Sequence, residues 1–342
     1  MSFQQFVIKA LLSLPKGLLV KMSGGEPLVI DGNTLEARTQ FLASQGAKAP
    51  SMTTLSAPDA RAATNQGLAL LGEKPRPDVT IKERTIPGPG GPLAVRLYAP
   101  TGSAGEALPG LVFFHFGGCV IGDLDTCHFF CSLLADICQC AVMSVDYRLA
   151  PENKFPAAIE DAVAAYEWAL ANGAEIGMDA NKIAVGGDSA GGYLSAVVAQ
   201  EMKRKGGRQP AAQLLIYPVT DMEAEGGSMV SCADCYPLST PVMHWFINHY
   251  LNTPAEAKDL RASPGKSDDL SGLAPAIVIT TGFDPLRDQG EDYANKLERA
   301  GVPVTYRCYG ELAHGFTAMT GAVPAAGAAC QDIAYDLHAL LN

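Results

Sequence analysis

The chain has 342 residues, of which 48% are hydrophobic and 18% are charged. Acidic residues outnumber basic ones by 36 to 25, which gives a net charge of −11, and no basic stripe is visible. The charge therefore argues against nucleic acid and membrane surfaces as partners and leaves small neutral molecules open. The length is enough to bury a large core, in one α/β domain with an elaboration or in two domains.

The chain contains nine cysteines, an odd number, and it lacks the features of a small secreted protein. Reduced thiols in a cytoplasmic protein are therefore the expectation. Cys232 and Cys235 make a single CxxC pair, and Cys127, His128 and Cys131 form a loose cluster. A structural zinc site would need a second matching pair, so we expect no metal and no cofactor.

The first 75 residues carry two or three helix-like segments, including 34–43 and 57–71, separated by glycine- and proline-containing breaks. An apolar run over 6–20 is interrupted by two lysines and a proline. It is too short and broken for a membrane span or a good signal peptide. We expect it to form an amphipathic helix that packs on the protein itself.

Strand patterns begin at residue 79. Two segments with period-two alternation, 79–86 and 93–98, are joined by a Pro-Gly-rich turn and predict an antiparallel hairpin. Continuous apolar strands then alternate with helices, which predicts a mostly parallel sheet covered on both faces. The predicted strands are 111–116, 141–145, 183–185, 214–217, 276–280 and 304–309, and the predicted helices are 157–171, 193–205, 288–300 and 328–341.

Residues 222–261 interrupt this alternation and contain a helix-like run around Trp245. An interruption at this point of the chain is typical of an insertion above the carboxyl edge of the sheet. Active sites of α/β proteins lie at that edge.

The stretch Gly187-Asp188-Ser189-Ala190-Gly191 lies between an apolar strand and a helix, which is the context of a G-x-S-x-G nucleophile elbow. In such an elbow the serine backbone is strained, and small residues two positions away let strand and helix pass closely. The start of the helix would aim free N–H groups at an oxyanion. The alternative is a glycine-rich turn with an incidental serine.

A serine nucleophile needs a base and an orienting acid, expected at later strand ends in the order Ser, Asp, His. Asp284 follows the predicted strand 276–280, and His314 follows the last one. Asp288 competes with Asp284 but is better explained as a residue at a helix N-terminus. The remaining candidate histidines lie in helix-like stretches, where structural or surface roles are commoner: His128, His244, His249 and His338.

An oxyanion hole would come from backbone N–H groups near the serine. The segment 113–119, Phe-Phe-His-Phe-Gly-Gly-Cys, ends a predicted strand. Gly117 and Gly118 can bring their N–H groups close to Ser189, and Ala190 would supply a third donor. A plain Gly-Gly turn is the alternative for this loop taken alone.

Six motifs in this order resemble the bacterial hormone-sensitive-lipase-like esterases, also called family IV. They are His115-Phe-Gly-Gly118, Tyr147-Arg-Leu-Ala-Pro-Glu152, Phe155-Pro-Ala157, Gly187-Asp-Ser-Ala-Gly191, Asp284-Pro-Leu-Arg-Asp288 and His314-Gly-Phe316. The resemblance runs from about residue 79 to the C-terminus. The N-terminal helices are similar to the cap of that family.

The resemblance implies an α/β-hydrolase fold with a helical cap, and hydrolysis of short-chain carboxylic esters. It implies the N-terminal part of the cap in 1–75, the catalytic domain in 76–342 and a second cap insertion in 222–261. It also makes a homodimer possible. The implied site residues are Ser189 as nucleophile, His314 as base, Asp284 as acid and Gly117, Gly118 and Ala190 as oxyanion donors, with Phe116, Cys119, Asp188 and Tyr193 in the substrate pocket.

Phe116 departs from the resemblance, because the family's loop normally reads His-Gly-Gly-Gly and Phe116 replaces the first glycine. The departure bears on the geometry of the loop and on the substrate range. Lactone or amide hydrolysis and acyl transfer remain alternatives, since a triad does not choose its acceptor. A non-catalytic small-molecule receptor is a further alternative, although the receptors similar to this family lack the catalytic histidine.

Overall fold

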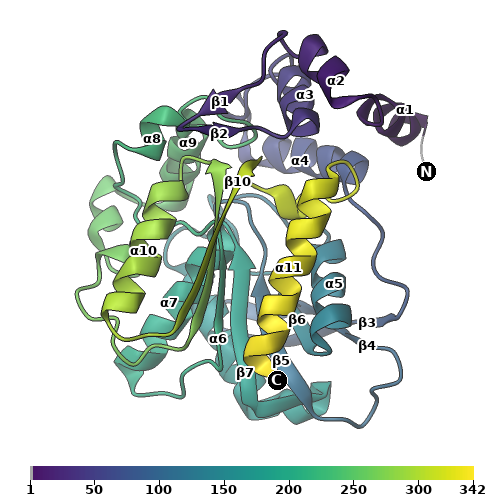
Figure 1. Cartoon of the computed structure of the whole chain (residues 1–342). Helices are drawn as coiled ribbons and strands as arrows, with labels where there is room; N and C mark the ends of the chain where they lie inside the picture. The colour runs from purple at the N-terminus through teal and green to yellow at the C-terminus, as the bar shows by residue number, and fades with distance from the viewer. Residues whose placement is uncertain (1–2) are drawn as a thin grey trace.

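The computed structural model describes residues 3–342 and is built on an eight-stranded sheet with the order β10-β9-β8-β7-β5-β6-β4-β3 (Figure 1). Strands β5 to β10 run parallel, whereas β4 pairs antiparallel with β3 and β6. The strands are β3 (Val79–Gly88), β4 (Gly91–Pro100), β5 (Leu108–Phe114), β6 (Ala141–Val145), β7 (Met178–Asp188), β8 (Gln213–Ile216), β9 (Ala276–Phe283) and β10 (Val304–Ala313), with β1 (Val29–Ile30) and β2 (Asn33–Thr34) forming a separate pair.

Helices connect the parallel strands and cover the sheet. The α-helices are α1 (Phe3–Leu12), α2 (Lys16–Met22), α3 (Ala37–Gly46), α4 (Ala57–Leu71), α5 (His128–Cys138), α6 (Ala157–Asn172), α7 (Ala190–Lys205), α8 (Ser228–Ser231), α9 (Thr240–Tyr250), α10 (Arg287–Arg299) and α11 (Pro324–Leu341). Short 3-10 helices are η1 (Met52–Thr54), η2 (Gly173–Ile176), η3 (Pro254–Lys258), η4 (Pro264–Lys266) and η5 (Phe316–Ala318).

Strand β5 illustrates why both sheet faces must be covered. Its side chains point alternately to the two faces, and nearly all of them are buried and apolar. Leu111 and Phe113 join a cluster with α5 and α11, whereas Val112 and Phe114 join a cluster with α6 and α7. The predicted α/β-hydrolase fold class is confirmed.

The predicted hairpin is present as β3 and β4, and its strands are longer than predicted because the ladder continues to the pair Gly88 and Gly91. The predicted single helix over 6–20 is wrong. Pro15 ends it, since proline cannot continue an α-helix interior, and the chain forms α1 and α2 instead. Leu12 and Leu19 are buried, in the same apolar cluster as residues of α3.

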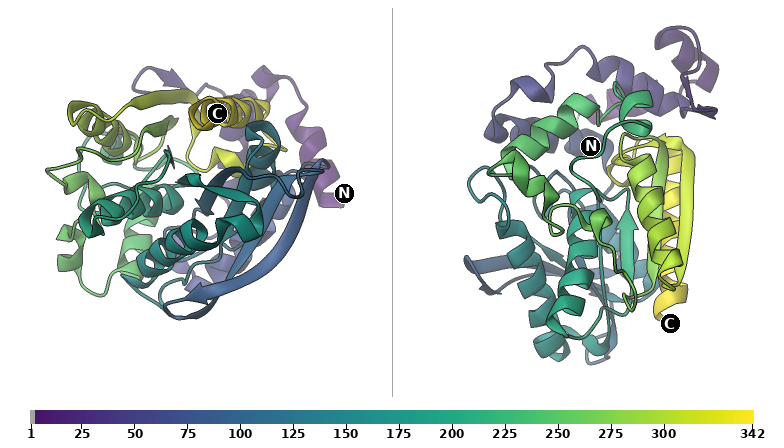
Figure 2. Two further views of the ribbon diagram at one scale, coloured as in Figure 1. Left: turned by 90° about the horizontal axis from the view of Figure 1, so that it is seen from below. Right: turned by 90° about the vertical axis from the view of Figure 1, so that its left-hand side faces the viewer.

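The N-terminal helices gather at one end of the molecule together with α8 and α9, which lie in the predicted insertion 222–261 (Figures 1 and 2). Residues 1 and 2 of the predicted cap segment 1–75 lie outside the described part of the chain. Within residues 3–342, no helix is long and apolar enough to cross a bilayer. The division into cap and catalytic domain stays a prediction.

Candidate active site

Ser189 lies at the turn between β7 and α7, in a strained backbone conformation with φ 56° and ψ −114°. A non-glycine residue there costs on the order of 1–3 kcal/mol and persists only where its surroundings fix it. The start of α7 passes so close to the end of the neighbouring strand β5 that a Cβ atom added to Gly191 would lie 1.8 Å from Phe114 O. The glycine is therefore required for the turn that presents the serine hydroxyl.

His314 joins Ser189 to Asp284. Its Nδ1 donates to Asp284 Oδ2 over 2.7 Å, because a carboxylate oxygen accepts. This leaves Nε2, 2.9 Å from Ser189 Oγ, to accept the hydroxyl proton. Ser189 and His314 are each 7% exposed and Asp284 is fully buried, so the chain of hydrogen bonds is largely shielded from water and most shielded at the acid.

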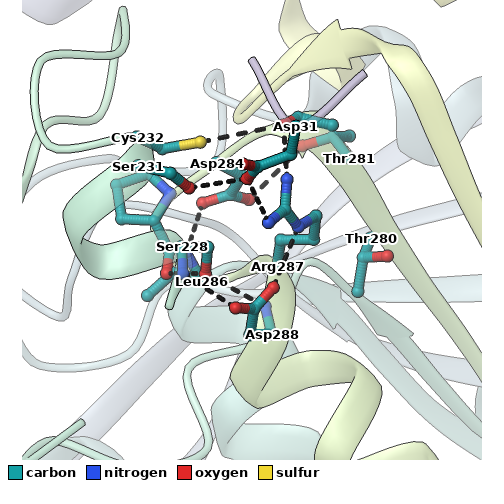
Figure 3. Close-up of polar contacts among 12 residues, drawn as sticks. Asp31, Ser228, Ser231, Cys232, Thr280, Thr281, Asp284, Leu286, Arg287 and Asp288 are labelled. Atoms are coloured by element: carbon teal, nitrogen blue, oxygen red, sulfur yellow. Dashed lines mark hydrogen bonds and ion pairs between the residues drawn. The ribbon is translucent and has the colours of Figure 1, made fainter. Parts of the chain in front are cut away.

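Asp284 is fixed by the turn that follows β9. Its Oδ1 accepts a hydrogen bond from Leu286 N at 2.8 Å (Figure 3). This leaves Oδ2 for His314. Thr281 Oγ1 lies 3.4 Å from the same Oδ2. The carboxylate is thereby oriented on both oxygens.

Asp288, the competing acid, lies elsewhere. Its Oδ2 accepts from Ser228 N at 2.8 Å and its Oδ1 from Arg287 Nε at 2.9 Å (Figure 3). It is in the first turn of α10, where a carboxylate is stabilised by the helix dipole. Of the two aspartates, only Asp284 contacts His314.

The loop after β5 carries two glycines, and Gly118 lines the same narrow cavity as Ala190, the residue after Ser189. Gly117 and Gly118 have φ of +124° and +60°, in the left-handed region that favours glycine. A Cβ atom at Gly118 would also lie 2.4 Å from the ring of Phe246 on α9. Within residues 3–342, no acceptor takes the N–H groups of Gly118 and Ala190, so both are available to a bound oxyanion.

His115 supports this loop through contacts with Tyr147 and with the backbone of Phe116. Its ring stacks on Tyr147 with the ring centroids 4.3 Å apart, and its Nδ1 donates to Phe116 O at 2.8 Å. Tyr147 donates its hydroxyl to His115 O at 2.7 Å. Burial lowers the pKa of His115 to about 4, so the imidazole is neutral at pH 7.

Asp188, predicted in the substrate pocket, faces away from it. Its fully buried carboxylate accepts from Thr317 Oγ1 at 2.6 Å, from Tyr217 OH at 3.1 Å and from the thiol of Cys127 at 3.4 Å. Burial raises the pKa of Asp188, against the effect of these donors. Neighbouring residues of a strand point to opposite faces of the sheet, so the Asp188 side chain lies on the other face from Ser189. Its hydrogen bonds there support the turn that carries Ser189.

Sequence reasoning missed Tyr217 and Thr317. The Tyr217 ring contacts the His314 ring at a centroid distance of 4.6 Å, and its hydroxyl lies 2.6 Å from Thr317 Oγ1. Tyr217 has φ +36°, an unusual value for a tyrosine. Its position in the sequence could have indicated Tyr217, because it directly follows β8 and so lies at the same edge of the sheet as the triad.

A narrow apolar cavity of about 20 Å³ opens beside Gly118 and Ala190, roughly the space of one water molecule. Cys119 and Tyr193 line it, as predicted for the substrate pocket, whereas Asp188 and Phe116 do not. The half-buried Phe116 packs against the apolar cluster of α5 and α11 instead. The remaining lining residues are Val219, Met222, Met243, Phe246, Ile247 and Tyr250, mostly from the segment 222–261.

A larger pocket of about 560 Å³ lies between residues 220–229 and α10, and no triad residue lines it. All nine cysteines are free thiols, and Cys308 is the exposed one. In the part of the chain that the structure describes, no group of three or more His, Cys, Asp or Glu residues could hold a metal ion.

Comparisons with known proteins give a consistent result. A family model described as the alpha/beta hydrolase fold matches residues 111–318. The carboxylic ester hydrolase LipN of Mycobacterium tuberculosis is 41% identical over 90% of this chain and 84% of its own length. An ethyl acetate hydrolase of Pseudomonas putida is 36% identical over 78% of this chain and 85% of its own.

Solved structures of esterases are similar over most of the chain. An ester hydrolase from the metagenome of Lake Arreo, complexed with a derivative of bipyridine phosphonate, has a TM-score of 0.86 at 38% identity and covers 89% of this chain and 98% of its own. A hyperthermophilic esterase of Pyrobaculum calidifontis has a TM-score of 0.83 at 37% identity, over 88% and 97%.

Proposed function

Since the chain belongs to the alpha/beta-hydrolase family, we propose that it hydrolyses carboxylic esters with short acyl chains, using Ser189 as nucleophile, His314 as base and Asp284 as acid. One observation carries the proposal. His314 bridges the Ser189 hydroxyl and the Asp284 carboxylate with hydrogen bonds of 2.9 and 2.7 Å.

The chemistry follows from this geometry. Ser189 Oγ attacks the ester carbonyl while His314 Nε2 takes its proton. The N–H groups of Gly117, Gly118 and Ala190 stabilise the oxyanion of the tetrahedral intermediate. His314 then returns the proton to the leaving alcohol, and water releases the acyl group by the same steps in reverse.

A short acyl group is favoured by the size of the cavity beside the oxyanion donors. Its volume of about 20 Å³ leaves room for a small acyl group only, and longer chains require the side chains of α9 to move. Ethyl acetate hydrolase, the name of one relative, fits the same size class. The cap assignment of 1–75 and 222–261, a cytoplasmic location and a possible homodimer stay predictions.

Turnover of activated esters with acyl chains of two to sixteen carbons tests the proposal, with Ser189→Ala as control. We expect the highest kcat/KM at two to six carbons and no turnover by the variant. A profile that peaks at long chains would contradict the short-chain assignment. Binding of ester analogues with neither turnover nor an acyl burst would indicate the receptor alternative instead.

Lactone and amide hydrolysis and acyl transfer use the same triad, and they are separated from ester hydrolysis by their products. With an added alcohol as competing acceptor, ester hydrolysis yields the free acid as the main product. A new ester as the main product would indicate an acyltransferase.

A further inference from the structure

Helix α4, from the N-terminal segment, contacts the oxyanion loop through Arg61. Arg61 Nε donates to Val120 O at 2.8 Å, and its Nη2 donates to Ala150 O at 2.8 Å. Ala150 N in turn donates to Cys119 O at 2.8 Å. The two carbonyl groups that follow Gly118 are therefore held, one by Arg61 directly and one through Ala150.

The loop needs such support because its backbone is strained. Cys119 has φ +58°, in the left-handed region, where a residue with a side chain costs about 1 kcal/mol or more. Inside the loop, Gly117 O accepts from the N–H groups of Val120 and Ile121 at 2.9 Å. Gly117 O and the Gly118 N–H belong to one planar peptide group, so these two hydrogen bonds set the direction of the Gly118 N–H. The two donors belong to the peptide groups of Cys119 O and Val120 O, the carbonyls that Ala150 N and Arg61 hold from outside the turn.

Helix α4 is seated on this loop over two turns. Ala57 and Ala60 are buried in the same apolar cluster as Val120 and Ile121. Asn65, one turn after Arg61 on the same helix face, donates to Asp123 Oδ2 at 2.9 Å. The position of Arg61 relative to the loop is thus determined by packing and not by its own side chain alone.

Glu152 orients the guanidinium. It accepts from Arg61 Nη1 at 2.9 Å and from Nη2 at 2.6 Å, a paired geometry that fixes the plane of the group. The hydrogen bond from Arg61 lowers the pKa of Glu152. Because the Glu152 side chain is 52% exposed, this ion pair adds little stability itself, and its loss can be separated from loss of the two carbonyl contacts.

We propose that Arg61 is a positioning residue for the oxyanion hole, which holds the carbonyls of Val120 and Ala150 so that the N–H group of Gly118 points at the tetrahedral intermediate. The inference rests on the proposed ester hydrolysis. None of the hydrogen bonds of Arg61 involves the triad. Because oxyanion donors act in the transition state, loss of Arg61 lowers kcat far more than it raises KM.

The test is Arg61→Met, which keeps an unbranched apolar stem and removes the donors. On p-nitrophenyl acetate we expect kcat to fall about 10- to 100-fold with KM within about threefold, less than the loss of an oxyanion donor itself. Phosphonylation of Ser189 by a p-nitrophenyl phosphonate should slow by a similar factor, because its phosphoryl oxygen occupies the same hole. Arg61→Lys keeps a charged donor and should recover part of both rates, and it also serves if Arg61→Met does not fold.

Two control variants separate positioning from general stability. Glu152→Gln removes the ion pair and keeps a hydrogen-bond acceptor for the guanidinium, so its loss of kcat should be smaller than that of Arg61→Met. Arg84→Met removes a surface pair with Glu175 and should keep kcat within about threefold. Folded Arg61→Met with wild-type kcat, a loss confined to KM, or an equal loss in Glu152→Gln would overturn the inference. A wild-type protein without esterase activity would overturn the proposed function, and the inference with it.

Discussion

The catalytic loops and the N-terminal helices meet at one end of the sheet but are held in different ways. Ser189, Asp284 and His314 are at most 7% exposed and follow the ends of buried strands, so backbone hydrogen bonds of the sheet fix their positions. Helix α2, by contrast, leaves Leu18 42% and Met22 47% exposed. The difference indicates that changes in the loops act on the chemistry, whereas changes on the exposed face of α2 act on solubility.

Polar contacts of the N-terminal segment reach the catalytic loops at separate places. Arg61 binds carbonyl groups next to the oxyanion loop, as described above. Asp31 accepts from Arg287 Nη2 at 2.7 Å, and Arg287 Nη1 also donates to Gly282 O, just before the acid (Figure 3). The hydrogen bonds of Arg61 and Asp31 thus connect this segment to residues next to the site.

The largest effect is expected for the triad. Ser189→Ala, His314→Ala and their double variant should each lose activity by about 10⁴-fold or more, by similar amounts, because the residues act as one unit. Kinetics of p-nitrophenyl acetate hydrolysis measure this. Ser195→Ala, a buried serine further along α7, is the matched control and should keep its rate. Losses that add up in the double variant would contradict shared function.

The two aspartates of the acid loop should differ in what they lose. Asp284→Asn should lower kcat by about 10⁴-fold, because the wrong His314 tautomer is then favoured. Asp288→Asn should keep kcat within a few-fold and lower the melting temperature, since its partners are Ser228 and Arg287. The test measures kcat and the melting temperature of Asp284→Asn and of Asp288→Asn. The reverse order of rates would show that Asp288 is the acid.

His115 should make the stability of the core depend on pH. The unfolded chain binds the His115 proton near its ordinary pKa of 6.5, whereas the folded chain binds it only near about 4. The free energy of unfolding therefore falls as the pH is lowered from about 6.5 to 4, by about 3 kcal/mol in total. Urea unfolding of wild type and His115→Asn across this range measures the effect. Parallel pH curves for the two proteins would contradict it.

Removal of the first 30 residues should affect the predicted cap without touching the triad. The deletion exposes apolar side chains of α3 such as Phe41, so we expect lower solubility and a loss of activity of about tenfold or more. Solubility and kcat/KM over the acyl-chain series measure this. An unchanged activity and chain-length profile would show that these helices do not form the cap.

The smallest effect is expected for Phe116→Gly. The loop keeps its backbone donors, so acetyl esters should stay within several-fold of wild type. The replacement of the family's glycine by a bulky ring predicts that the variant also accepts esters of bulkier alcohols. The packing of Phe116 against the cluster of α5 and α11, and not in the cavity, predicts no such gain. The test is the ratio of kcat/KM between variant and wild type, measured for esters of primary, secondary and tertiary alcohols. A constant ratio means that the ring is remote from the substrate.

The sequence by itself was enough for the alternation of strands and helices, the elbow around Ser189 and the order of the triad residues. Each of these depends on local patterns, namely apolar runs, glycines at fixed offsets and a polar residue just after a strand. Asp284 and His314 directly follow β9 and β10, and parallel strands bring such positions to one edge. Element boundaries were less accurate, as for β7, which begins at Met178 and not at 183.

Tertiary structure alone decided which side chains support these residues. Arg61 contacts Ala150, and Tyr217 contacts Thr317, across 89 and 100 positions of sequence. No periodicity or spacing encodes such pairs, because they arise only when separate elements pack together. The same holds for Asp188, whose neighbour in sequence is the nucleophile, but whose carboxylate turns to the opposite face of the sheet, where Thr317 and Tyr217 can satisfy it in the absence of water.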